Sequence, residues 1–309
     1  MENAIQNIGR RRWDVLSSRW RDYLPDVIAK MPKAYEAPAK DELVLERMRS
    51  IGSLNQFETI DDAPKIRTLI FEAGRFSVER CIYFTRTAEQ LAAQGVPTAA
   101  LTASYLGMMF GSRAMQSLLG IYYCFNQNST WMIDVWSAAS DATNQGRVIE
   151  WTPRILALVS NRRIGHEHHW KIFMRLRSVT TRLPVDDAAI GVLRRLQDHV
   201  NFSVRRNDVQ YNDQWPYYDL YERFFERLNG LDIGVLPERF DVTGNDKDYD
   251  LKAAQIFMYC AVAMLLDVLW PLPKFRSYCI QLKERLSAEW HPLINAGALA
   301  KDVAALAKL

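Results

Sequence analysis

The stretch TAALTASYLGMMFGSRAMQSLLGIYYCF, residues 98–125, decides the fold because it carries one continuous stripe along its length. The stripe residues alternate in steps of four and three, which places them on one face of a helix: Leu101, Tyr105, Met108, Ser112, Met115, Leu119 and Tyr122. Small residues beside the stripe would allow a neighbouring helix to approach closely: Ala103, Gly107, Gly111 and Ala114. The stretch therefore predicts a long helix packed into a core, rather than a cofactor site.

The same helical pattern continues along the chain, because glycine and proline are sparse and separate long periodic segments. We expect further helices near residues 10–30, 41–51, 63–94, 131–142, 152–178, 186–207, 216–229, 250–270, 274–290 and 295–308. The predicted fold class is therefore all-α, a multi-helix bundle. Breaks near residues 95 and 235 divide it into an N-terminal helical region (1–95), a central bundle (96–235) and a C-terminal helical region (236–309) that packs on the bundle or at an interface.

Composition and cysteine usage are those of an ordinary globular protein, with 49% hydrophobic and 24% charged residues. The four cysteines, Cys81, Cys124, Cys260 and Cys279, are scattered in apolar surroundings, which predicts buried free thiols rather than disulfides or a zinc site. The longest uninterrupted apolar run, 256–266, is well short of the ~20 residues that span a bilayer. With no apolar stretch after the first charged residues, we expect a cytoplasmic protein without membrane insertion.

Charge is distributed unevenly, although the net charge is only +3. Between Arg147 and Arg206, twelve lysine and arginine residues face five acidic ones. This surplus indicates either a polyanionic partner or helix faces that are solvated through arginine.

The N-terminal segment GRRRWDVLSSRWRDYL, residues 9–24, interleaves five arginines with two tryptophans and a tyrosine. Such a segment can bind nucleic acid through charge and stacking, or lie on an anionic membrane. Its larger apolar residues also recur at helical spacing, namely Trp13, Leu16, Trp20 and Leu24. This spacing favours a docking helix with an arginine-rich outer face.

Two further sets of residues are candidates for a site. In the predicted helix 186–207, a strip of Arg195, His199, Phe202 and Arg206 borders the apolar face, so it can line a groove or a dimer seam. His166 and His169 are three residues apart, as metal ligands on a helix can be. No carboxylate is spaced to complete a ligand set, so we expect neither a metal nor another cofactor.

Three segments together resemble the HEPN superfamily: SYLGMMFGSRAMQSLLGI, then GHEHHWKIFMRL, then LRRLQDHVNFSVRRNDVQY. In that family an aromatic-rich helix with an embedded arginine precedes a helix with a His-x-x-Trp-like segment. A final helix ends in an arginine, a short polar tract and an aromatic residue. The resemblance covers about residues 98–215.

The resemblance implies a four- or five-helix bundle that usually dimerises, and in many members a metal-independent endoribonuclease of toxin–antitoxin or antiphage systems. The family's arginine falls on Arg206, and its histidine position falls on Tyr211. A phenol is a poor base at pH 7, because its ordinary pKa is near 10. His199, two helical turns before Arg206, is therefore a candidate for the missing imidazole.

The resulting expectation is an RNA-directed protein, in which Arg206, Tyr211 and His199 act catalytically within a homodimer or larger assembly. RNA contacts are expected at Arg195, Phe202, Arg205, Asn207 and Arg113. The alternative is a catalytically inactive scaffold or sensor subunit, which binds a protein partner encoded nearby, and the missing motif histidine favours it. A small-molecule enzyme is disfavoured, because no Gly-rich phosphate loop or nucleophile elbow is present.

Overall fold

The computed structural model describes residues 10–28, 58–61, 64–126, 129–136, 154–160, 166–185 and 244–287. Most of these residues are helical, as predicted. The α-helices in this part of the chain are α2 (Trp13–Ile28), α4 (Pro64–Ala93), α5 (Pro97–Leu118), α6 (His166–Val179), α10 (Gly244–Leu269) and α11 (Arg276–Ser287). A 3₁₀ turn, η4 (Pro273–Phe275), connects α10 to α11.

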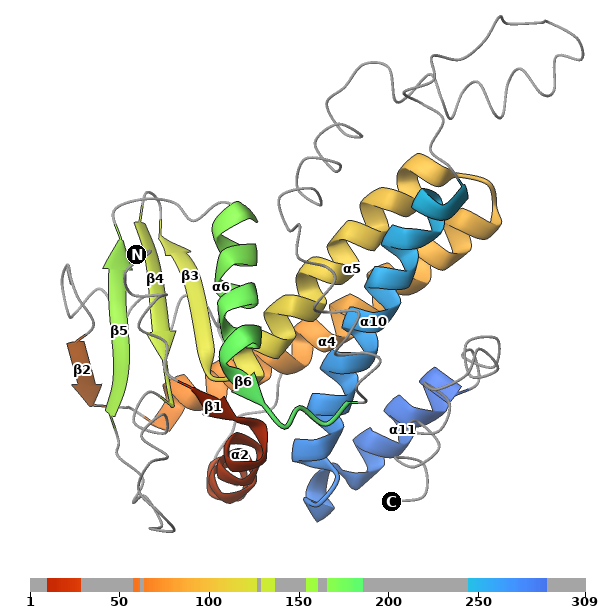
Figure 1. Ribbon diagram of the computed structural model, residues 1–309. Coiled ribbons are helices and arrows are strands. Elements are labelled where there is room, and N and C mark those ends of the chain that lie inside the picture. The colour runs from red at the N-terminus through yellow and green to blue at the C-terminus, as the bar shows by residue number, and fades with distance from the viewer. Residues whose placement is uncertain are drawn as a thin grey trace, which may run out of the picture.

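The described strands form one sheet and one short parallel pair. The sheet is antiparallel with the order β2-β5-β4-β3, from β2 (Glu58–Asp61), β3 (Ile121–Asn126), β4 (Ser129–Asp134) and β5 (Arg154–Ser160). The parallel pair joins β1 (Arg11–Arg12) to β6 (Thr180–Thr181), with Arg11 opposite Thr180. Figure 1 shows the sheet at one end of the long helices, with α6 beside β3.

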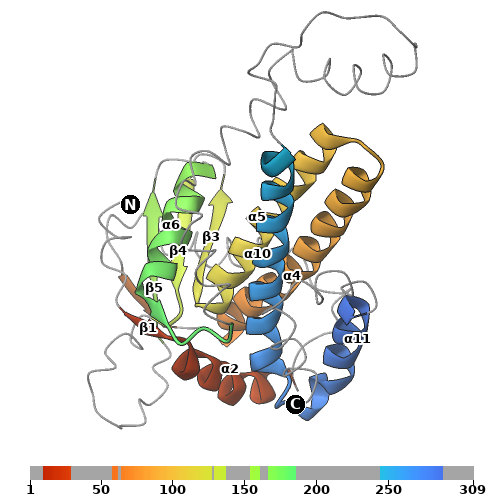
Figure 2. The same cartoon turned by 45° about the vertical axis from the view of Figure 1, so that its right-hand side comes forward.

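The long helices α4, α5 and α10 pack against one another and form the centre of the core (Figures 1 and 2). Their close approach depends on glycines of α5. A Cβ atom at Gly111 would lie 2.9 Å from Phe257 Cβ on α10 and 3.0 Å from Cys81 Sγ on α4. A Cβ atom at Gly107 would lie 2.7 Å from Thr85 Oγ1 on α4. The prediction that small residues beside the stripe allow close packing is therefore confirmed at these two positions.

Helix α2 docks on this core through the apolar residues that the helical spacing predicted. Trp13, Leu16, Trp20 and Leu24 are all buried. Trp13 Nε1 donates to Asp267 of α10 at 2.8 Å, and Trp20 Nε1 donates to the Leu118 carbonyl at 2.7 Å. The predicted docking helix is thus confirmed, and α2 lies at the lower end of α10 in both views.

Three predicted helices must be corrected in part, because the all-α prediction did not include the sheet. The helix expected over 98–125 ends at Leu118, and residues 121–126 form β3. The helix expected over 131–142 begins within β4, and the one expected over 152–178 consists of β5 followed by α6. The chain turns at Gly120, whose φ is +85° and whose missing Cβ leaves room for Trp136, 2.2 Å from the position that a Cβ would occupy. Such a backbone conformation favours glycine.

Other expectations have mixed outcomes. The helices predicted near 63–94, 250–270 and 274–290 correspond to α4, α10 and α11. Those predicted near 41–51, 186–207, 216–229 and 295–308 lie outside the described residues.

Cys81, Cys260 and Cys279 are buried free thiols, as predicted. The division into three regions stays a prediction, and the described core draws on residues from all three. None of the described helices combines the length and apolar character needed to cross a membrane.

Substitution of Gly111 by alanine tests the close packing of the three helices. The added methyl group meets Phe257 Cβ and Cys81 Sγ, so the free energy of unfolding should fall by about 1–3 kcal/mol. This loss should occur although alanine is the better helix former by about 1 kcal/mol. Urea titration measures it, with Tyr83→Ala on the solvent-facing side of α4 as the control. A Gly111→Ala protein as stable as the wild type would contradict the packing.

Candidate nucleic-acid interface

The three consecutive arginines just before α2 have different environments, because side chains alternate in an extended segment. Arg11 points inward and is only 4% exposed, whereas Arg10 and Arg12 are exposed. Arg11 Nη1 donates to the Leu119 carbonyl at 2.6 Å, and its Nη2 forms an ion pair with Asp134. Asp134 also accepts the backbone N–H of Trp136 at 3.0 Å. Arg11 is therefore an internal anchor, and its neighbours carry charge to the surface.

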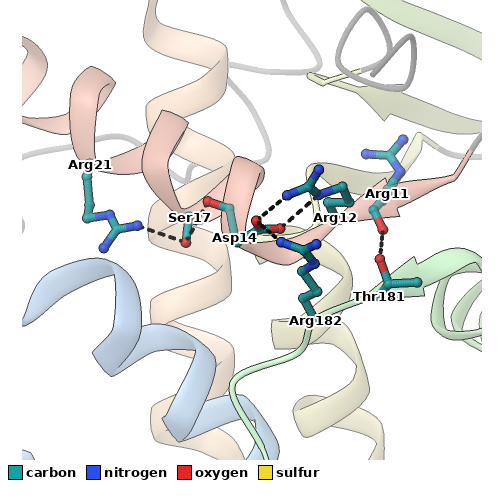
Figure 3. A network of polar contacts seen from close by, with 7 residues as sticks. All are labelled: Arg11, Arg12, Asp14, Ser17, Arg21, Thr181 and Arg182. Atoms are coloured by element: carbon teal, nitrogen blue, oxygen red, sulfur yellow. Dashed lines mark hydrogen bonds and ion pairs between the residues drawn. The ribbon is translucent and has the colours of Figure 1, made fainter. Parts of the chain in front are cut away.

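The β1–β6 pair brings the N-terminal arginines beside the end of α6, about 170 residues later in the sequence. Thr181 Oγ1 donates to the Arg11 carbonyl at 3.3 Å, next to the ladder itself. Figure 3 shows Arg182 reaching from the segment after β6 toward Asp14 in the first turn of α2, which Arg12 of β1 also contacts. The pairing thus assembles one surface from two distant segments.

Asp14 is shared by two arginines in this surface. Arg12 binds it in a bidentate manner, with Nη2 to Oδ2 at 2.7 Å and Nε to Oδ1 at 3.2 Å. Arg182 Nη1 contacts the same Oδ2 at 3.1 Å. The hydrogen bond from Arg12 chiefly lowers the pKa of Asp14, and the same contact raises the pKa of Arg12. The single carboxylate of Asp14 balances only one of the two guanidinium charges. Arg12, Asp14 and Arg182 together therefore remain positively charged.

Arg182 has a backbone φ of +60°, in the left-handed region. This conformation costs a residue with a side chain roughly 1 kcal/mol, and it persists where surrounding contacts hold it. Here the β6 ladder precedes the residue and Asp14 holds its side chain. The strained backbone therefore places an exposed guanidinium, 63% accessible, next to α2.

We refer to Arg10, Arg12, Arg21 and Arg182, together with Asp14, as the basic surface. Arg21 lies one turn after Ser17, and its Nη2 donates to the Ser17 hydroxyl at 3.1 Å (Figure 3). Four guanidinium groups thus accompany one carboxylate. The remaining acidic residue of this part of α2, Asp22, is exposed on the same helix.

Two histidines in the first turn of α6 contact α5. His166 Nδ1 lies 2.6 Å from the Tyr105 hydroxyl, and His169 Nε2 lies 2.6 Å from Ser112 Oγ. Ser112 donates its single proton to the Met109 carbonyl at 2.9 Å, so His169 donates from Nε2. Burial lowers the pKa of His169 to about 3, and the charge of Arg113 adds to this effect. His169 is therefore a neutral core residue.

The pair His166 and His169, considered above as metal ligands, thus contacts two different side chains of α5. Within the described ranges, no three residues of the His, Cys, Asp or Glu types are grouped closely enough to hold a metal ion.

Most residues of the predicted active site lie outside the described residues: Arg195, His199, Phe202, Arg205, Arg206, Asn207 and Tyr211. Their roles stay predictions. Arg113 is described and lies half-buried between α5 and β3. Its guanidinium is 5.6 Å from the Tyr123 ring centroid and 6.0 Å from that of Tyr122. It also approaches the Tyr123 carbonyl at 3.5 Å.

The sequence pattern identified the N-terminal arginines as a group but did not single out Arg12, Asp14 or Arg182. The signal for Arg12 was present, since it flanks the apolar face of a docking helix. No local signal marks Arg182, because its proximity to Asp14 arises from pairing between segments that are far apart in the sequence.

Comparisons with known proteins found no match for this chain. No family model matches the chain, and no match was found among curated proteins or solved structures.

The buried neutral His169 makes stability depend on pH. Its pKa is about 3 in the folded chain and near 6.5 when unfolded, so the unfolded state binds more protons between these values. The contribution is fully present above pH 6.5 and is lost as the pH falls toward 3. From this residue alone, the free energy of unfolding should fall by about 2 kcal/mol between pH 6.5 and 5.

The measurement is urea unfolding at both pH values for the wild type and His169→Gln, whose amide can still donate to Ser112. The glutamine protein should lose less stability on acidification, while the half-buried His166→Gln serves as the matched control. Equal acid losses in the wild type and His169→Gln would show that His169 is not held neutral.

Proposed function

We propose that this chain is an RNA-directed protein whose basic surface contacts phosphate groups of the RNA backbone. The observation that carries the proposal is the junction of Arg12 and Arg182 at Asp14, where two exposed guanidinium groups share one carboxylate. Guanidinium groups bind phosphate oxygens in a planar, bidentate geometry. Contacts of this kind supply much of the affinity for nucleic acid and position the protein along the strand.

Asp14 gives the surface a specific property, because a phosphate must compete with its carboxylate for the two arginines. The arginines stay oriented in the absence of a ligand, and their excess charge remains free to attract an anion. Arg10 adds a further exposed guanidinium, and among the described residues it makes no ion pair. The arrangement therefore favours a polyanion, which can contact several arginines at once, over a single small anion.

The choice of RNA over DNA, and of cleavage as the activity, is supported by the resemblance to the HEPN superfamily. In this proposal Arg206 holds the scissile phosphate, and His199 and Tyr211 handle protons at the 2′- and 5′-oxygens. The proposed activity is a metal-independent endoribonuclease effector of a bacterial defence or stress system, which acts as a homodimer. The basic surface would guide RNA, and the chemistry would take place elsewhere on the chain.

RNA binding tests the role of the basic surface. Fluorescence anisotropy with a labelled single-stranded oligoribonucleotide is measured over a salt series for the wild type and Arg12→Gln/Arg182→Gln. Removal of one phosphate-binding arginine should reduce the slope of log K against log salt by about 0.7, so the double variant should bind more weakly and with a slope lower by about 1.4. Arg86→Gln, whose arginine is paired with Glu89 on α4, is the matched control. A wild-type protein that does not bind RNA at low salt would refute the proposal.

Cleavage is tested separately. The wild type should cut RNA in the presence of a chelator, and Arg206→Ala should abolish cutting. The variant should still bind RNA, with a salt slope lower by about 0.7 for the one lost phosphate contact, and its melting temperature should be unchanged. A wild-type protein that binds RNA without cutting it would contradict the ribonuclease proposal and favour the inactive-subunit alternative.

A further inference from the structure

Three aromatic rings lie together along the contact of α4 with α5. The rings of Phe84, on α4, and Phe110, on α5, are stacked nearly parallel, with centroids 5.5 Å apart and planes at 6°. Tyr83 packs against Phe84 with 5.2 Å between the ring centroids and planes at 78°. The guanidinium carbon of Arg80 lies 5.3 Å from the centroid of the Phe110 ring. We refer to Arg80, Tyr83, Phe84 and Phe110 as the aromatic face.

The aromatic face is turned toward solvent, unlike the helix contact beside it. Cys81 and Gly111 meet inside the helix pair, and Arg80 and Phe110 each precede one of these two residues. A rotation of about 100° per residue therefore turns both side chains away from the buried contact. Tyr83 is 66% exposed, the most exposed large hydrophobic side chain in the part of the chain that the structure describes. Most of this residue is thus accessible to a ligand.

Arg80 differs from Arg75 and Arg86, the neighbouring arginines of α4, in its charge environment. Arg75 and Arg86 each form an ion pair with a glutamate three or four residues away. The positions three and four residues from Arg80 offer no carboxylate, since they are Phe76, Ser77, Tyr83 and Phe84. Within the described ranges, Arg80 is exposed and forms neither a hydrogen bond nor an ion pair. Its charge is therefore open to an anion from outside.

Helix α5 adds a second arginine to this side of the helix pair. Arg113 lies three residues after Phe110, within one helical turn, and is half-buried. Its guanidinium approaches the Tyr123 carbonyl and two tyrosine rings of β3 rather than a carboxylate. None of the positions three, four or seven residues from Arg80 or from Phe110 is acidic. The aromatic face and its surroundings on the two helices are therefore positively charged.

A single-stranded nucleic acid matches both properties of this face. Its bases present flat π-surfaces that stack on aromatic rings, and its phosphates bind guanidinium groups. A small inorganic anion would use the arginines without the rings. An apolar helix from a protein partner would cover the rings but leave the charge of Arg80 unmatched.

We propose that the aromatic face is a stacking platform for the bases of single-stranded RNA. A base stacks on the exposed ring of Tyr83, and Arg80 contacts the adjoining phosphate. This inference rests on the proposed RNA-directed function, and it adds a contact with bases to the backbone contacts of the basic surface. Every base has a π-surface, so the platform would hold a strand without specifying its sequence. A duplex, whose bases are already stacked on one another, would not use it.

The first test compares two labelled strands of equal length by fluorescence anisotropy: an oligoribonucleotide and a base-free ribose-phosphate strand. The wild type should bind the strand with bases more tightly. Tyr83→Ala should weaken that binding by about 5- to 100-fold and leave the base-free strand unaffected. Tyr83→Phe keeps the ring and should bind both strands like the wild type.

Two further variants separate this inference from the proposed function. Ile280→Ala removes another exposed large hydrophobic side chain, on α11, and should bind both strands like the wild type. Arg12→Gln/Arg182→Gln should weaken binding of both strands alike. A wild type that binds the two strands equally, or a Tyr83→Ala protein with an unchanged preference for bases, would overturn the platform and leave the basic surface standing. A wild type that binds neither strand would refute both proposals.

Photocrosslinking locates the stacked base directly. An oligoribonucleotide that contains thiouridine, irradiated together with the wild type, should give adducts on the peptide around Tyr83 by mass spectrometry. Adducts confined to other parts of the chain would contradict the proposal. Gel filtration tests the other occupant of such a face, a second copy of this chain. If Tyr83→Ala changes the oligomeric state but keeps the preference for bases, the face is a contact between copies and the platform is wrong.

Discussion

The close contact of α5 with α4 and α10 is the constraint on which the rest of the molecule depends. At Gly107 and Gly111 the helices approach so closely that no side chain fits between them. α5 ends at Leu118, beyond this contact, and the turn at Gly120 then directs the chain into β3 and the sheet. Helix α2 in turn rests on the end of α5, through the bond from Trp20 to the Leu118 carbonyl. The basic surface beside α2 therefore depends for its position on the packing of three helices.

Sequence reasoning located the long helices because their apolar residues repeat with a helical period over many turns. It failed where the pattern is short. The segment of β5, RILALVS, contains the continuous apolar run ILALV, and a run of that length fits a buried strand as well as a piece of buried helix. In residues 119–125, Leu119 and Tyr122 continue the spacing of the preceding stripe. Gly120 is a local signal of a helix end in this segment, although the periodic stripe continues past it.

The same distinction applies to the candidate site: some of its features follow from a local sequence pattern, and others follow from contacts between distant segments. The burial of Trp13 and Trp20 follows from helical spacing, and the arginines beside them are consequently placed toward the outside. The meeting of Arg12 with Arg182 at Asp14 follows from contacts between segments that no local pattern connects. The three consecutive arginines illustrate the difference. They are identical residues in the sequence, yet Arg11 is buried in the core while Arg10 and Arg12 lie on the surface.

The parallel pairing of β1 with β6 has a consequence for the order of events during synthesis. Helix α2 obtains its partners late: Leu118, Asp134, Arg182 and Asp267 are separated from their α2 and β1 contacts by 98 to 254 residues. An amphipathic helix with two tryptophans therefore leaves the ribosome long before its docking surface exists. Until then its apolar face is open to chaperones, and the arginine groups come together only as the last parts of the fold close over it.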